Sequence, residues 1–312
     1  MSKCHGMALA FVALLCLGWL NGCALKKVMV GQFVGVVGTG MPALEQNNDL
    51  RLLAQALPSH LVLLETLLAN DPHNAELLVL LSRSYGAYAF AVLETEWEAR
   101  RFGCPTVIGS QESVQSLEQR ISSYFAKGKT YALEALDIAV PQIRRRLRDI
   151  NEARTALDAL DRRQVPALFW YGFNLGGYVQ HNMDDIQVMS QAYLVEKAMN
   201  RVIELDPSYY HGNAHLILLV YYASRSPMMG GNLKLALSHY EQHRRLIPQA
   251  VPLREMFWAR YYLVQEQQRE AFMKLLGDVV HGGSEKEPLG LLDQVAVTRA
   301  RIYLSAVDRL FD

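Results

Sequence analysis

The chain has 312 residues, of which 51% are hydrophobic and 20% are charged. This composition is typical of a well-packed protein of one or two domains and argues against a disordered chain. The formal net charge is zero, which argues against a nucleic-acid partner, because nucleic-acid binding depends on a net basic surface.

Residues 1–22 have the features of a secretory signal peptide. Basic Lys3 precedes an apolar run over residues 7–20, which is shorter than the roughly 20 residues that a membrane span requires. The tetrapeptide LNGC at residues 20–23 then resembles the lipobox of bacterial lipoproteins. The resemblance implies that Cys23 is acylated, becomes the mature N-terminus and anchors the protein to a bacterial membrane. Asn21 departs from the usual Ala or Ser, so a plain signal peptide or a retained anchor stays open as an alternative.

The cysteines provide no disulfide framework. Cys4 and Cys16 lie in the predicted signal peptide and Cys23 carries the predicted lipid, which leaves Cys104 alone. A single thiol cannot form an intrachain disulfide, so we expect the stability of the mature chain to come from helix packing.

Residues 23–48 are predicted to be the lipidated N-terminus and a mobile tether. The run VMVGQFVGVV at residues 28–37 is apolar, but it is short and interrupted by glycine, so no further membrane span is expected. The folded domain is predicted to cover residues 49–312.

Apolar residues recur at helical spacing through this domain. The first stripe covers residues 49–69, and a long helix follows in which Leu78, Leu81, Ser82 and Tyr85 have the spacing of the first helix of a tetratricopeptide (TPR) unit. Further helices are predicted at 117–140, 142–163, 165–178, 195–205, 216–222, 236–243, 253–262, 269–279 and 289–311. No stretch has the alternating pattern of a strand, which predicts an all-α protein.

The segment 195–248 shows how these helices are organised. One helix ends at Asp206-Pro207, a second precedes the turn Gly230-Gly231-Asn232, and a third ends at Pro248. This is the pattern of TPR units, helix pairs of about 34 residues that cannot bury their apolar faces alone. We therefore predict a TPR-like α-solenoid of stacked helix pairs. Helix 289–311 would be a long C-terminal cap with Arg299, Arg301, Asp308 and Arg309 on a polar outer face.

Aromatic residues are the candidates for a ligand site. The predicted helix 165–178 is apolar nearly all round, so it is buried or faces an apolar cavity. Most such residues are ordinary core, but tyrosines combine an apolar body with a polar point, as the wall of a ligand channel requires. The candidates are Phe169, Trp170, Tyr171, Phe173, Tyr178, Tyr209, Tyr210, Tyr221 and Tyr222.

No motif for catalysis or for a cofactor is present. The chain lacks Gly-x-Ser-x-Gly, His-Glu-x-x-His and a phosphate-binding loop. The pairs His211/His215 and His239/His243 have a spacing that places both rings on one helix face, which is half of a zinc site. Neither pair has a supporting acid or thiol on that face. We predict neither an enzyme nor a metal or cofactor site, and a metal-dependent enzyme built on these histidines is the rival reading.

Four blocks of sequence resemble the T-protein (TatT) family of TRAP (tripartite ATP-independent periplasmic) transporters. The blocks are VPALFWYGFNLGGY at 165–178, LDPSYYHGNAH at 205–215, PMMGGNLKLALSHYEQ at 227–242 and AVTRARIYLSAVDRLF at 296–311. The resemblance extends from about residue 31 to residue 311. Its most specific parts are the helix with Trp170 and the turn of Pro227, Gly230, Gly231 and Asn232. Asn232 stands where the family usually has Asp, and His243 replaces a usual small Ala.

The resemblance implies a periplasmic, membrane-anchored lipoprotein that forms a homotrimer, each protomer having an apolar channel. A periplasmic substrate-binding protein would dock on it, and a small hydrophobic or amphipathic ligand would pass between them. The alternative is a general TPR scaffold for protein–protein interaction in the cell envelope, which needs no channel.

Overall fold

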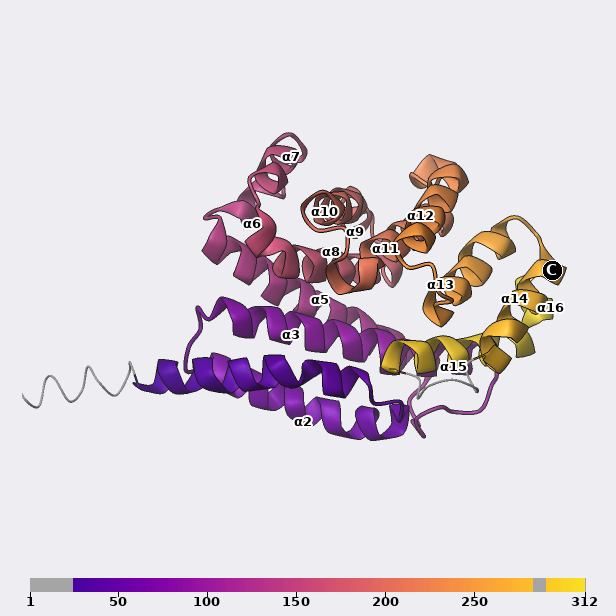
Figure 1. The fold of residues 1–312 in the computed structure, drawn as a ribbon, viewed down its shortest axis with the longest axis horizontal. Coiled ribbons are helices and arrows are strands. Elements are labelled where there is room, and N and C mark those ends of the chain that lie inside the picture. The colour runs from indigo at the N-terminus through magenta and orange to yellow at the C-terminus, as the bar shows by residue number, and fades with distance from the viewer. Residues whose placement is uncertain (1–24, 283–289, 312) are drawn as a thin grey trace, which may run out of the picture.

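The computed structural model describes residues 25–282 and 290–311, so Cys23 and the predicted signal peptide lie outside the described residues. Every regular element in these two ranges is a helix, which confirms the predicted all-α class. The long helices of the N-terminal half lie along the long axis of the molecule, and the later helices stack on them in chain order, as in an α-solenoid (Figure 1).

The N-terminal half begins with the helix Leu25–Glu45, which carries no label in Figure 1. It is followed by α2 (Leu50–Leu68), α3 (Ala75–Tyr88), η1 (Ala89–Leu93), α4 (Glu94–Arg101), α5 (Val114–Ala139), α6 (Ile143–Arg146) and α7 (Ile150–Asp158). The C-terminal half comprises η2 (Arg162–Gln164), α8 (Val165–Gln180), α9 (Ile186–Met189), α10 (Ala192–Leu205), η3 (Tyr209–Gly212), α11 (Asn213–Ala223), η4 (Pro227–Met229), α12 (Leu233–Leu246), α13 (Pro252–Phe257), η5 (Trp258–Leu263), α14 (Arg269–Gly282), α15 (Leu291–Ser305) and α16 (Val307–Leu310).

Polar residues at the helix starts explain where several of these helices begin. The side chain of Asp49 accepts hydrogen bonds from the backbone N–H groups of Arg51 and Leu52, at 2.9 and 3.0 Å. Asn74 accepts one from Leu77 in the same way, at 3.0 Å. Such side chains satisfy N–H groups that have no partner inside the helix.

The first helix corrects the predicted tether. Residues 25–45 form a continuous helix whose Val30, Val34 and Met41 are buried against α2 and α3. Val30 and Val34 are four residues apart, so they lie on one face. The apolar run at residues 28–37 is thus part of a longer helix that covers the edge of the domain.

Two described helices are long and apolar enough to cross a membrane by length and composition alone. One is the helix Leu25–Glu45, close to the N-terminus. The other is the unbroken helical stretch Ala75–Arg101, made of α3, η1 and α4, of whose most apolar part 78% is buried inside the protein. That burial makes it the central core helix of the fold.

The close approach of α3, α5 and α8 forms the centre of the molecule. Asn174 of α8 donates from its Nδ2 atom to the backbone oxygen of Ser82 and to the backbone oxygen of Trp170, at 3.1 and 2.8 Å. A Cβ atom at Gly86 or Gly128 would lie 2.5 or 2.3 Å from the Asn174 side-chain oxygen. Only glycine at these two positions allows the three helices to meet around one buried amide.

Two predicted long helices are shorter in the structure. The segment 142–163 is divided into α6, α7 and η2, because the Asp149 side chain accepts from the N–H of Asn151 at 2.8 Å and starts a new helix. The predicted capping helix 289–311 is interrupted at Ala306. Arg299, expected on its polar outer face, is 2% exposed and bonds to the core helix. Helix α15 near the C-terminus therefore packs against α4, the last part of the core helix Ala75–Arg101.

Candidate functional site

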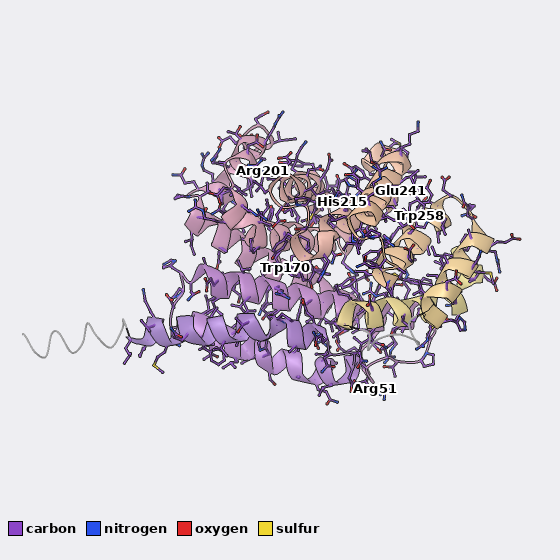
Figure 2. The ribbon with its side chains drawn as sticks, viewed as in Figure 1. Arg51, Trp170, Arg201, His215, Glu241 and Trp258 are labelled. Atoms are coloured by element: carbon purple, nitrogen blue, oxygen red, sulfur yellow. The ribbon has the colours of Figure 1, made fainter. Side chains whose placement is uncertain are left out.

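A cavity of about 150 Å³ lies between the long N-terminal helices and the later helices. Its wall contains residues of the helix Leu25–Glu45, of α3, α8, α11 and α13, and of α15. A cavity that holds one water needs ~10–15 Å³ on a comparable measure, so this one has room for a small ligand. Figure 2 shows Trp170, one of the wall residues, at the centre of the molecule.

One face of α8 supplies much of the wall. Phe169, Trp170, Phe173, Gly176, Gly177 and Gln180 line the cavity, and their spacing follows a single helical stripe. The rings of Trp170 and Phe173 meet edge to face with centroids 5.3 Å apart. Aromatic pairs in this geometry hold one another in fixed orientations, so this wall is rigid.

One face of α11 forms another part of the wall. Asn213, Leu216, Ile217, Val220 and Tyr221 line the cavity, again at the spacing of one helical stripe. Five of the aromatic candidates from the sequence are therefore wall residues, namely Phe169, Trp170, Phe173, Tyr210 and Tyr221.

The other four candidates pack elsewhere, although all are in the described part of the chain. Tyr171 is 3% exposed on another face of α8. Tyr178 is half-buried beneath the Lys129 ammonium, 4.2 Å from its ring centroid. Tyr209 meets the edge of Phe169, and Tyr222 stacks on His239 at 5.7 Å. The sequence could not separate them from the wall residues, because adjacent aromatics on one helix point in different directions.

A polar cluster of Glu45, Arg83 and Tyr210 lines the cavity on the side of the N-terminal helix. The Tyr210 hydroxyl donates to Glu45 Oε1 at 2.9 Å, and Arg83 forms an ion pair with the same carboxylate. The Arg83 guanidinium lies 5.4 Å from the centre of the Tyr210 ring. Burial, followed by the charge of Glu45, raises the pKa of Tyr210, so its hydroxyl stays protonated as a donor.

Sequence reasoning missed this cluster. Glu45 lies in the segment predicted as a tether, and Tyr210 lies between the predicted helices 195–205 and 216–222, where apolar spacing predicts no side-chain direction. The structure instead has Tyr210 and His211 in left-handed conformations, with φ of 47° and 59°. This turn directs the Tyr210 ring back towards Trp170, with centroids 5.0 Å apart.

A second polar cluster joins Glu94, Arg299 and His181. Glu94 and Arg299 line the cavity and form an ion pair at 3.1 Å, while His181 Nε2 lies 3.0 Å from the other Glu94 oxygen. Burial acts to raise the pKa of Glu94, but the hydrogen bond with His181 and the charge of Arg299 outweigh it and hold that pKa below its usual range. The pair ties α15 to the core helix across the cavity wall.

A third arginine of the wall, Arg225, follows the end of α11 and is 9% exposed. The next residues form the turn of Pro227, Gly230, Gly231 and Asn232. Gly230 has a φ of 87°, and the Asn232 side chain accepts from the N–H groups of Lys234 and Leu235 and so starts α12. A Cβ atom at Gly231 would lie 1.8 Å from the backbone oxygen of Arg225, so only glycine permits this turn.

Of the two predicted histidine pairs, His239 and His243 both lie in α12, whereas His211 and His215 are arranged differently from the prediction. His211 precedes the start of α11 and has a left-handed backbone, so it does not share a helix face with His215. Instead, His215 Nδ1 lies 3.0 Å from His239 Nδ1. Burial, followed by the charge of His215, lowers the pKa of His239 to about 4, so the ring is neutral at pH 7. The described residues contain no group of three or more His, Cys, Asp or Glu side chains able to hold a metal ion.

Comparisons with known proteins identify relatives of the chain. A model of the TRAP transporter T-component family matches residues 46–311. A protein of Treponema pallidum (strain Nichols), described as uncharacterized, is 24% identical over 272 residues, which are 85% of this chain and 81% of that protein. The matched family is the one that the four sequence blocks resemble.

Proposed function

Because the chain belongs to the TRAP transporter T-component family, we propose that it binds the periplasmic substrate-binding subunit of the transporter and passes a small hydrophobic or amphipathic ligand to or from it. Membership of this family supports a role in transport rather than in catalysis. The ligand would occupy the cavity between α8 and α11. In this proposal the chain is an accessory protein that holds its cargo non-covalently.

The cavity is the observation that carries the ligand part of the proposal. Phe90, Trp170, Phe173 and Phe257 supply aromatic walls, and polar groups are confined to a few positions. Ligand sites in proteins have this composition, in which apolar walls provide affinity and a few polar groups fix the orientation. A peptide-binding scaffold would instead present a polar concave surface.

We propose that the protein is a periplasmic lipoprotein anchored through Cys23. One residue, Ala24, separates Cys23 from the helix Leu25–Glu45, whose packing against α2 and α3 would hold the domain close to the membrane. Replacement of Cys23 by Ala should release the protein from the membrane fraction of cells, with Cys104→Ala as the matched control that stays in it. Equal retention of the Cys23→Ala variant would contradict the anchor.

A homotrimer is the proposed assembly, on the strength of the family. Apolar side chains at the surface, such as Met228 with 98% and Ile186 with 86% exposure, are suited to a protein interface. Analytical ultracentrifugation of the purified protein should give three times the mass of one chain. A monomer at micromolar concentration would contradict the trimer and leave the binding role intact.

Partner capture tests the proposed function directly. The tagged protein is crosslinked in its own cell envelope, purified and analysed by mass spectrometry. A periplasmic solute-binding protein in roughly equal amount would support the proposal. A varied set of envelope proteins without such a subunit would contradict it and favour the general scaffold.

A further inference from the structure

The charged residues of the cavity wall do not balance. The wall contains the carboxylates of Glu45 and Glu94 and the guanidinium groups of Arg83, Arg225 and Arg299. Glu45 pairs with Arg83, and Glu94 pairs with Arg299. One positive charge, that of Arg225, is therefore left without a carboxylate.

The contacts of Arg225 leave its binding capacity largely unused. Its Nη1 atom donates to the backbone oxygen of Tyr221 at 2.8 Å, and the guanidinium lies 4.1 Å from the centre of the Tyr221 ring. Its Nε atom is buried without a hydrogen-bond partner, and Arg225 forms no ion pair within 4.0 Å among the described residues. Burial lowers the pKa of Arg225, and only the weaker influence of Tyr221 opposes this.

An unpaired buried charge is costly, because the low-dielectric interior replaces the water that would solvate it. The neighbouring Ser224 hydroxyl also lines the cavity and has no hydrogen-bond partner. The Ser224 hydroxyl and the Arg225 Nε–H group are thus two neighbouring hydrogen-bond donors that have no acceptor in the described structure. The Gly231 turn, packed on the Arg225 backbone oxygen, fixes where these donors lie.

We propose that Arg225 binds the anionic head group of an amphipathic ligand, a monocarboxylate whose apolar chain lies between the aromatic face of α8 and the largely aliphatic face of α11. This rests on the proposed function and names its ligand class. A guanidinium matches a carboxylate through parallel N–H···O bonds. One carboxylate supplies the single negative charge that the wall lacks, and Ser224 can donate to the same group.

The test compares two probes of similar chain, octanoate and octan-1-ol, in calorimetric titrations of the purified protein. The wild type should bind octanoate more tightly than octan-1-ol. Arg225→Gln should weaken octanoate binding by at least about tenfold, which corresponds to ~1.4 kcal/mol, and leave octan-1-ol binding unchanged. Arg225→Lys, which keeps the charge but not the fork, should give an intermediate value.

Arg163→Gln is the matched control, because this arginine is exposed, with 84% of its side chain accessible, and pairs with Asp161. It should bind both probes as the wild type does. Thermal melting of each unliganded variant shows whether it is folded. If Arg225→Gln does not fold, the test rests on Arg225→Lys. An octanoate affinity of Arg225→Lys equal to that of the wild type would then overturn the proposal.

The outcomes separate this proposal from the one on which it rests. If octanoate and octan-1-ol bind equally well and Arg225→Gln changes neither, the cavity remains a ligand site but Arg225 has no role in selecting an anion. If neither probe binds the wild type, the cavity does not accept an alkyl chain and this proposal fails. Capture of the solute-binding protein would in that case still support the proposed function.

Discussion

Two adjacent glycines in α8 provide a stringent test of the packing that forms the cavity. A Cβ atom at Gly177 would lie 2.5–2.6 Å from three atoms of the Phe125 ring, whereas one at Gly176 would lie 3.6 Å from the nearest atom, a methyl carbon of Val195. Carbon atoms in optimal contact are ~3.5–4.0 Å apart. Gly176→Ala therefore fits, and Gly177→Ala requires the ring to move by roughly 1 Å.

The magnitudes follow from two opposing effects. Alanine is favoured over glycine inside a helix by ~0.8–1.0 kcal/mol, and this gain is common to both variants. Overpacking of a well-packed core costs ~1–3 kcal/mol, and Phe125 is 1% exposed and held against Phe173 at 6.0 Å. We expect Gly176→Ala to be as stable as the wild type or more so, and Gly177→Ala to be less stable than Gly176→Ala by ~1–3 kcal/mol.

Urea unfolding followed by far-ultraviolet circular dichroism measures this difference, with both variants purified in parallel. Because both variants gain the same helix propensity, the difference between their free energies of unfolding measures the contact between α8 and α5. Phe125 also lines the cavity, so its displaced ring should reduce the affinity for an alkyl chain in Gly177→Ala. Equal free energies of unfolding for the two variants would refute the described packing of α8 against α5.

Further predictions concern the cavity wall and its polar clusters. Trp170→Ala should lower the free energy of unfolding by ~3–5 kcal/mol, because this ring is 2% exposed, and Trp170→Phe should lower it less; equal urea midpoints for the two variants would contradict the described burial. The lowered pKa of Glu94 means that its stabilising contribution is present above the unfolded value of ~4.3 and is lost as the pH falls through the native value. Glu94→Gln should therefore be less stable than the wild type at pH 7 and approach it as the pH falls through the lowered native pKa of Glu94, as urea unfolding at each pH would show, and a gap that widens in acid would contradict the pairing. Gly231→Ala should also weaken octanoate binding, because the added methyl meets the Arg225 backbone oxygen; calorimetry that finds unchanged affinity would contradict a positioning role for this turn.

The amino-acid sequence by itself determined the helical class and the approximate place of most helices. Those features depend on local interactions, such as the spacing of apolar residues and the capping of helix starts by Asp49 and Asn74, which act within one or two turns. The four sequence blocks likewise identified the family, whose model matches residues 46–311. The sequence also selected the apolar helix with Trp170 as a candidate wall.

The tertiary structure alone decided which residues surround the cavity. Tyr210 meets Glu45 across 165 residues, and Arg299 meets Glu94 across 205. No local pattern encodes such pairs, because they depend on how rigid helices stack and not on the preferences of neighbouring residues. Because of the same stacking, the segment predicted as a tether is a helix packed against the domain. Arg299, which was expected at the surface, is buried in the core for the same reason. The sequence could not single out Arg225, because the absence of a carboxylate beside its guanidinium depends on which residues the fold brings near it.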